Sequence, residues 1–122
     1  SAVLDPLPDE VIQLKEYMAK DKPYLDPSLN VNGLARQLKM PVKELSILIN
    51  HNLNQHFFDF INSYRIQEAM KILSDPERKV FTVLEILYEV GFNSKSSFNT
   101  AFKKYASLTP TEYRKKYCKS DS

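Results

Sequence analysis

The fold is decided by the stretch from residue 91 to residue 117, GFNSKSSFNTAFKKYASLTPTEYRKKY, because it is a second copy of a pattern already present at residues 39–60. At an offset of 52 the matched apolar pairs are Leu34/Ile86, Leu38/Val90 and Met40/Phe92. After a one-residue insertion the offset becomes 53, and the matched pairs are Leu45/Phe98, Ile49/Phe102 and Phe60/Tyr113. The chain therefore contains an internal repeat.

Each copy of the repeat predicts a helix-turn-helix. A short apolar helix runs into a tight turn, and a longer helix follows with large apolar residues four positions apart. In a helix-turn-helix the second helix is able to enter the major groove of DNA. We call these second helices, at residues 42–52 and 95–105, the recognition helices. Two copies within 122 residues indicate contact with two successive stretches of duplex.

Length and composition agree with a small helical chain. A length of 122 residues predicts one domain or two small subdomains that share a linker. The single cysteine, Cys118, has no partner for an internal disulfide, so a reducing cytoplasm is the expected compartment. The sequence contains neither an apolar run of membrane-spanning length nor a signal-peptide pattern.

The net charge of +2 hides an asymmetry along the chain. Residues 1–30 carry three lysines against six acidic residues, which gives −3. Residues 95–122 carry seven basic residues against two acidic ones, which gives +5. A polyanion is therefore attracted to the C-terminal end and repelled by the N-terminal end. A basic tail that only aids solubility would explain the charge alone, but its position inside the second copy favours nucleic acid.

An N-terminal helix is predicted over residues 9–20, with Asp9 as its cap. Its inward side is expected to consist of Val11, Ile12, Leu14 and Met18. Two prolines then predict an extended link over residues 22–30.

In the first copy, Asn30 or Asn32 is expected to cap a short helix that ends near Lys39. The recognition helix at 42–52 follows and is predicted to bury Leu45, Leu48 and Ile49. Its opposite face presents Lys43, Ser46, Ile47 and Asn50, at i, i+3, i+4 and i+7. Ile47 has two equally good interpretations: it contacts a thymine methyl group, or it packs against a neighbouring helix.

A long helix is predicted over residues 55–74. The side chains expected on its buried stripe are Phe57, Phe58, Ile61, Tyr64, Arg65, Ala69, Ile72 and Leu73. At a rise of ~1.5 Å per residue it measures ~30 Å, close to the ~34 Å between equivalent grooves of B-DNA. A rigid helix of that length lets both copies dock on one face of the duplex.

In the second copy a short helix is predicted over residues 82–90, and Gly91 supplies the positive φ of a tight helix exit. Asn93 or Ser94 caps the recognition helix. The residues expected to face inward are Phe98, Ala101, Phe102 and Tyr105, and those expected to face outward are Lys95, Ser96, Asn99, Thr100 and Lys103. A last helix over residues 110–117 presents basic residues. An acid-free polar face inside a repeated unit favours nucleic-acid contact over a merely solvated surface.

The sequence contains no pattern typical of catalysis. His51 and His56 are five positions apart, which is not the i, i+4 spacing of a helical metal pair, and no cysteine accompanies them. A glycine-rich phosphate loop and a nucleophile–base signature are both absent from the sequence. We therefore expect no enzyme, no metal and no cofactor.

A specific signature in the second copy consists of Ile86, Gly91, Phe92, Ser94, Phe98, Phe102, Lys103, Lys104, Thr109, Pro110, Tyr113 and Arg114. With these residues the chain resembles, over residues 25–117, the DNA-binding region of AraC/XylS-type transcription regulators. The first copy, with LSILIN and FFDFINSYRIQEAMKIL, is similar to a Bacteroidetes-like variety in which this domain often follows a sensor region. The resemblance implies seven helices, two helix-turn-helix subdomains and gene regulation from an asymmetric promoter site.

The resemblance also implies which residues contact DNA. The base-contacting positions of the family fall on Lys43, Ser46, Ile47 and Asn50 in the first copy and on Lys95, Ser96, Asn99 and Thr100 in the second. The residues that we expect to bind phosphate are Lys103, Lys104, Arg114 and Lys115. Lys39 and Ser107 stand where the family often has glycine, so we expect strained turns there, whereas Asn54 tolerates the left-handed region.

We predict an all-α fold in four segments: an N-terminal helix with its linker (1–24), a first helix-turn-helix subdomain (25–54), a linker helix (55–75) and a second subdomain with a basic tail (76–122). The predicted function is sequence-specific binding of a bipartite promoter site. The alternative is a helical protein-interaction module of a signalling regulator that has lost useful DNA affinity. The expected partners are double-stranded DNA, a sensor or dimerisation region outside this chain, and RNA polymerase. The expected location is the cytoplasm, or the cytoplasmic end of a membrane-linked regulator.

Overall fold

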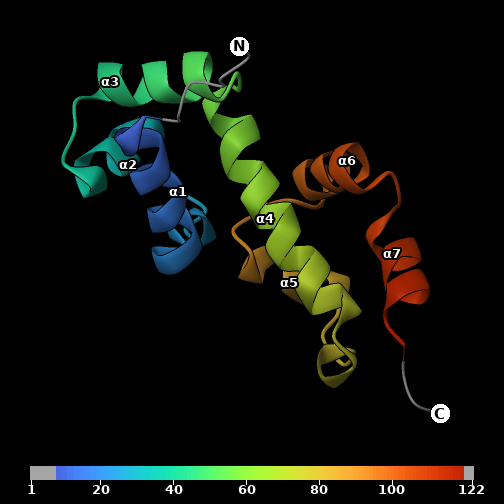
Figure 1. Ribbon diagram of the computed structural model, residues 1–122. Coiled ribbons are helices and arrows are strands. Elements are labelled where there is room, and N and C mark those ends of the chain that lie inside the picture. The colour runs from blue at the N-terminus through green and yellow to red at the C-terminus, as the bar shows by residue number, and fades with distance from the viewer. Residues whose placement is uncertain (1–7, 120–122) are drawn as a thin grey trace. The chain divides into compact units, whose positions relative to one another are not determined.

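The computed structural model describes residues 8–119, and their regular structure is entirely helical (Figure 1). The α-helices are α1 Asp9–Asp21, α2 Val31–Leu38, α3 Val42–Ile47, α4 Phe57–Ser74, α5 Val83–Glu89, α6 Lys95–Ala106 and α7 Pro110–Tyr117. α3 continues without a break into a π-helical turn, Leu48–Asn52. The predicted all-α fold is confirmed, with seven α-helices within residues 8–119.

The chain divides into two compact units. The first unit contains α1, α2 and α3, and the second contains α4 to α7 together with the segment Tyr24–Ser28. The N-terminal helix thus belongs to the same unit as the first copy of the repeat. The two recognition helices lie in different units: α3 is in the first unit and α6 is in the second.

Side-chain caps explain where α2 and α6 begin. The Asn30 side-chain oxygen accepts a hydrogen bond from the Gly33 N–H at 2.8 Å, and the Ser94 hydroxyl accepts one from the Ser97 N–H at 3.2 Å. Of the predicted alternatives, Asn30 and Ser94 are therefore the caps. The predicted cap at Asp9 is wrong: Asp9 is the first residue of α1, and among the described residues no side chain caps the start of this helix.

Two capping boxes begin α5 and α7. In each, the threonine hydroxyl accepts from the N–H of the glutamate three residues later, and the glutamate accepts from the threonine N–H in return. These hydrogen bonds hold the pKa values of Glu85 and Glu112 below the ordinary value for glutamate. Each capping box therefore stabilises the folded chain at pH values above the pKa that its glutamate has in the unfolded chain. This stabilisation is lost as the pH falls through the lower pKa of the glutamate in the folded chain.

The backbone repeats the same irregularities in both copies. Lys39 (φ 58°) and Gly91 (φ 106°) occupy the left-handed region 52 positions apart. Asn54 (φ 53°) and Ser107 (φ 61°) do so 53 positions apart. These are the two offsets of the sequence repeat, so the turn after each short helix and the exit from each recognition helix correspond. Lys39 and Ser107 adopt the left-handed conformation expected of them without the freedom of glycine.

The core of the first unit is aliphatic. α1 packs against the π turn, and α2 packs against α3. The buried side chains include Val11, Leu14, Met18, Leu34, Ala35, Leu45, Leu48 and Ile49. Ile12, predicted to join this core, is 43% exposed. It lies about 100° around the helix from Val11, which places it outside the stripe formed by Val11, Leu14 and Met18.

The core of the second unit is built from α4, α5 and α6. Its buried cluster consists of Ile66, Ala69, Ile72, Leu73, Ile86, Leu87, Val90, Phe92, Phe98, Ala101 and Phe102. Phe58, predicted to lie on the buried stripe of α4, is instead 57% exposed. It stands in the first turn of α4, on the N-terminal side of this cluster.

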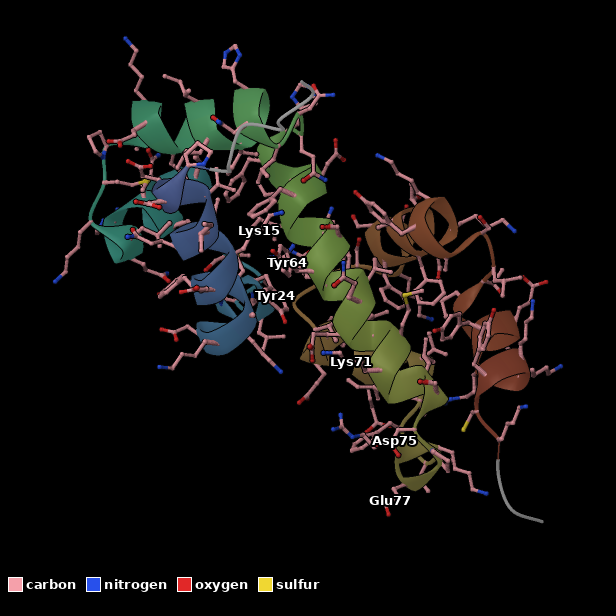
Figure 2. All side chains as sticks on the ribbon, in the orientation of Figure 1. Lys15, Tyr24, Tyr64, Lys71, Asp75 and Glu77 are labelled. Atoms are coloured by element: carbon pink, nitrogen blue, oxygen red, sulfur yellow. The ribbon has the colours of Figure 1, made fainter. Side chains whose placement is uncertain are left out.

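Arg65 joins the Tyr24–Ser28 segment to α4. The Arg65 side chain is 5% exposed, and its guanidinium donates to the Tyr24 carbonyl at 2.7 Å, the Asp26 carbonyl at 3.0 Å and the Asn62 side chain at 3.1 Å. Tyr24 stacks on Tyr64 of α4 with ring centroids 5.5 Å apart (Figure 2). The predicted extended link is wrong in this part, because Pro23–Leu25 forms a short 3-10 helix.

The same segment packs against the turn between α5 and α6. A Cβ atom added at Gly91 would overlap the Tyr24 carbonyl oxygen and lie 2.8 Å from Arg65 Nε. Gly91 is therefore required twice, for its positive φ and for the close approach of this backbone. The turn holds the start of α6 in place and so positions the exposed face of that helix.

Candidate nucleic-acid interface

α6 is held in the second unit by aromatic side chains. Phe98 and Phe102 are fully buried, and Ala101 beside them is 7% exposed. The Phe98 ring lies 5.3 Å from Phe92 and 5.6 Å from Phe102, and Phe102 meets Tyr113 of α7 edge-on at 5.6 Å. Because these contacts fix the rotation of α6 about its axis, the opposite face is fixed as well.

The opposite face of α6 is exposed, polar and free of acidic residues. All five residues predicted to face outward are exposed: Lys95, Ser96, Asn99, Thr100 and Lys103. The first turn of α6 contains no carboxylate. The positive end of the helix dipole and the charge of Lys95 therefore both attract negative charge to this end of the helix. This face suits a partner that carries negative charge and hydrogen-bonding groups.

Tyr105, predicted to point inward, lies at the edge of this packing. It is 36% exposed, and its hydroxyl donates to the Asp59 carbonyl oxygen at 3.0 Å. The prediction of a buried side chain is wrong because the phenol reaches along α4 to a backbone acceptor.

A surface groove of about 580 Å³ runs beside α6. Lys95 and Asn99 line it, together with Val83, Leu84, Leu87, Thr109, Pro110 and Thr111 from α5 and the start of α7. A larger hollow of about 700 Å³ is lined by residues such as Ile72, Phe81 and Tyr88. None of the predicted base-contacting residues lines the larger hollow, so the groove at Lys95 and Asn99 is the one relevant to α6.

The predicted phosphate-binding residues have different surroundings. Lys103 and Lys115 are exposed. Lys104 is also exposed, and its amine lies 3.3 Å from an Asp59 carboxylate oxygen. An exposed pair of this kind contributes little to stability, so Lys104 can exchange Asp59 for a phosphate at small cost.

Arg114 is the exception among them. Its guanidinium donates to the Phe81 carbonyl at 2.6 Å and to the Arg78 carbonyl at 3.4 Å. Its Nε atom is buried without a hydrogen-bond partner among the residues that the structure describes. In this arrangement Arg114 ties α7 to the segment before α5, a role that the charge pattern did not reveal.

The recognition helix of the first unit has a more mixed face. Lys43, Ile47 and Asn50 are exposed, and Ser46 is half-buried. Ile47 is 45% exposed, so it is an apolar group on an otherwise polar surface. Glu44, also exposed, puts a carboxylate in the first turn of α3. The buried side of this helix, Leu45, Leu48 and Ile49, is as predicted.

The shifted pKa values in the described residues have structural causes. Burial raises the pKa of Tyr24, Tyr64 and Tyr113 above the ordinary value for tyrosine. Hydrogen bonds from Ser28 lower the pKa of Asp26. Among residues 8–119 the structure contains no group of three or more His, Cys, Asp or Glu side chains able to hold a metal ion. No helix in this range is both long and apolar enough to cross a membrane.

The fold and this interface define a helix-turn-helix domain with two recognition helices. The helix-turn-helix domain family matches residues 34–116. The chain is 30% identical over 87 residues to the uncharacterized HTH-type transcriptional regulator YdeC of Bacillus subtilis, covering 71% of this chain and 29% of that protein. It is 28% identical over 90 residues to the melibiose operon regulatory protein of Escherichia coli, covering 74% of this chain and 29% of that protein.

Among solved structures, the C-terminal domain of AraT, a response regulator from Geobacillus stearothermophilus, is similar with a TM-score of 0.78 and 25% identity. The similarity covers 96% of this chain and 93% of that chain. The chain belongs to the AraC family of helix-turn-helix, DNA-binding transcription regulators. It spans 29% of the length of the two curated relatives.

Proposed function

We propose that this chain binds a bipartite, non-palindromic DNA site, with α6 and α3 each in a major groove. The observation that carries the proposal is the face of α6, which is polar, free of acidic residues and held rigidly by Phe98 and Phe102. Its base-contacting residues are Lys95, Ser96, Asn99 and Thr100. Those of the first recognition helix are Lys43, Ser46 and Ile47 of α3 and Asn50 of the π turn.

The chemistry of these side chains supports base contact. An asparagine amide is able to pair with both the N6 and N7 positions of adenine, and a lysine amine with the N7 and O6 acceptors of guanine. Asn99 and Lys95 line the groove beside α6, where the flanking α5 and α7 leave space. An exposed Ile47 suits the methyl group of thymine.

The basic residues near α6 provide positioning contacts. We assign phosphate binding to Lys103, Lys104, Arg114 and Lys115, because phosphate contacts set register without selecting sequence. Lys104 must leave Asp59 to bind, at small cost. Arg114 must share its guanidinium with the Phe81 and Arg78 carbonyls, so we expect it to contribute less than the three lysines.

The alternative, a protein-interaction module, is favoured by one observation. The face of α3 combines the exposed apolar side chain of Ile47 with the neighbouring carboxylate of Glu44. A carboxylate is repelled by DNA phosphates, and an exposed apolar side chain is able to pack against a protein surface. Tight binding to a protein partner with no salt-sensitive DNA binding would favour this function over the proposed one.

Removal of one side chain separates base contact from phosphate contact. We expect Asn99→Ala to weaken binding of the preferred duplex by about 1–3 kcal/mol and to leave non-specific duplexes unaffected. Lys104→Ala should weaken binding to all duplexes about equally and reduce the salt slope by about 1. Both residues are exposed, so neither change should alter the fold.

Fluorescence anisotropy with a selected and a scrambled duplex measures both effects. If the base preference of the Asn99→Ala variant is the same as that of the unmodified chain, Asn99 is not a base contact. Arg114→Ala is a poor choice for this comparison, because the substitution also removes hydrogen bonds to two carbonyls.

A further inference from the structure

The π turn at the end of α3 changes which residues its outer face presents. Leu53 N–H donates to the Leu48 carbonyl at 3.1 Å, a bond between residues five positions apart. An α-helix advances by about 100° per residue. A π turn holds more residues per turn, so each residue from 48 to 52 advances by less.

Because of this smaller advance, the last residues of the helix lie at different positions around the helix axis from those they would have in an α-helix. In an uninterrupted α-helix, Asn50 would lie on the same face as Lys43, seven positions before it, and Ile47, three positions before it. His51 would lie at the side of that face. With the smaller advance of a π turn, helical geometry puts residue 51 in line with residues 43 and 47 and moves residue 50 off that line. His51 is exposed, and Leu48 and Ile49 on the other side remain buried.

The second copy shows the arrangement without this change. At the repeat offset of 53, His51 corresponds to Lys104. α6 is α-helical through Ala106, and Lys104 there lies on the flank with its amine 3.3 Å from Asp59 of α4. The repeat alone therefore predicts that His51 is a flank residue, and the π turn reverses that prediction.

We propose that His51 is a base-contacting residue of the first recognition helix. The proposal rests on the proposed function and adds a specificity-determining residue to it. A neutral imidazole has one donor and one acceptor nitrogen, and base edges in the major groove present both kinds of partner. Together with Lys43 and Ile47, His51 gives the outside of the helix a line of one cation, one apolar group and one imidazole.

The chain offers a matched control in its other histidine. His56 is also exposed, but it follows the π turn and precedes α4. The probe is the duplex selected by the unmodified chain, together with versions in which one half-site is scrambled. Binding is measured for His51→Ala, His56→Ala, Asn50→Ala and His51→Gln, which keeps a donor and an acceptor. Far-UV circular dichroism checks that each variant is folded.

We expect His51→Ala to lower affinity for the selected duplex about 5- to 100-fold and to broaden the base preference in the half-site bound by the first unit. His56→Ala should change affinity less than twofold. Asn50→Ala should lower affinity by a smaller factor than His51→Ala does. His51→Gln should bind more tightly than His51→Ala and so recover part of the loss. A large effect of Asn50→Ala with none of His51→Ala would overturn the proposal. So would a loss from His51→Ala that is equal on all duplexes, which indicates a phosphate contact. Failure of the unmodified chain to bind any duplex would reject the proposed function instead.

Discussion

Gly91→Ala should lower the free energy of unfolding of the second unit by at least about 3 kcal/mol. Gly91 has φ 106°, a conformation that strains any residue with a Cβ atom. The added methyl group would also overlap the Tyr24 backbone carbonyl and lie 2.8 Å from Arg65 Nε. Moving either group away would disturb the buried hydrogen bond of 2.7 Å between them. A loss of this size is a large part of the stability of a small domain.

Gly33→Ala is the matched control. Gly33 lies in the first turn of α2, and an added Cβ atom would meet only the Asn30 side chain at 3.4 Å and the Leu29 side chain at 3.9 Å. We expect this change to be neutral or to stabilise the first unit by up to about 1 kcal/mol. Urea unfolding followed by far-UV circular dichroism compares the two variants. If Gly91→Ala unfolds at the same urea concentration as the unmodified chain, the result contradicts the close contact of Gly91 with Tyr24 and Arg65.

DNA affinity should fall steeply with salt. If about four to six phosphates are neutralised, the slope of log affinity against log salt is about −4 to −5, which corresponds to a roughly 250- to 1,000-fold loss between 50 and 200 mM salt. The basic residues available for these contacts are Lys43, Lys95, Lys103, Lys104, Arg114 and Lys115. Anisotropy titrations at several salt concentrations measure the slope.

Lys20→Ala is the control for this experiment, because Lys20 is exposed on α1 in the acidic N-terminal part of the chain. It should leave the slope unchanged, whereas Lys103→Ala should reduce its magnitude by about 1. A slope near zero, or an equal change from both substitutions, would contradict binding through the basic residues around α6.

The sequence was sufficient to predict those features that depend on neighbours along the chain. The repeat predicted the position of both recognition helices, and the left-handed residues recur at the same two offsets. Caps and exits follow from local hydrogen bonding and from the conformational freedom of glycine, as at Asn30 and Gly91. Burial along α6 also followed from helical spacing, because Phe98 and Phe102 dominate one side of it.

Features that depend on distant partners could not be predicted in this way. Arg65 was expected on the buried stripe, but its bonds to the Tyr24 and Asp26 carbonyls join residues about 40 positions apart. Arg114 had the sequence pattern of a phosphate ligand, and it bonds to carbonyls of the segment before α5. Backbone acceptors of this kind leave no signal in the sequence, because every residue carries one.

The candidate site shows the same limit. Helical spacing predicted the exposure of Lys95, Asn99 and Lys103 on α6. It also assumed a constant advance per residue through the first recognition helix, and the π turn at Leu48–Asn52 breaks that assumption. The side chains at 50 and 51 are therefore the part of the site that needed the three-dimensional structure.

Selection of bound duplexes from a random library is the most direct test of the central claim, that the two copies contact two stretches of DNA through α3 and α6. We expect one non-palindromic consensus of about 16–20 base pairs, with its halves about one helical turn apart. The half bound by α6 should show the sharper base preference, and the half bound by α3 should depend more on DNA shape and phosphate contacts. Recovery of no enriched sequence by the folded chain, or of a palindrome of two equal halves, would contradict the account.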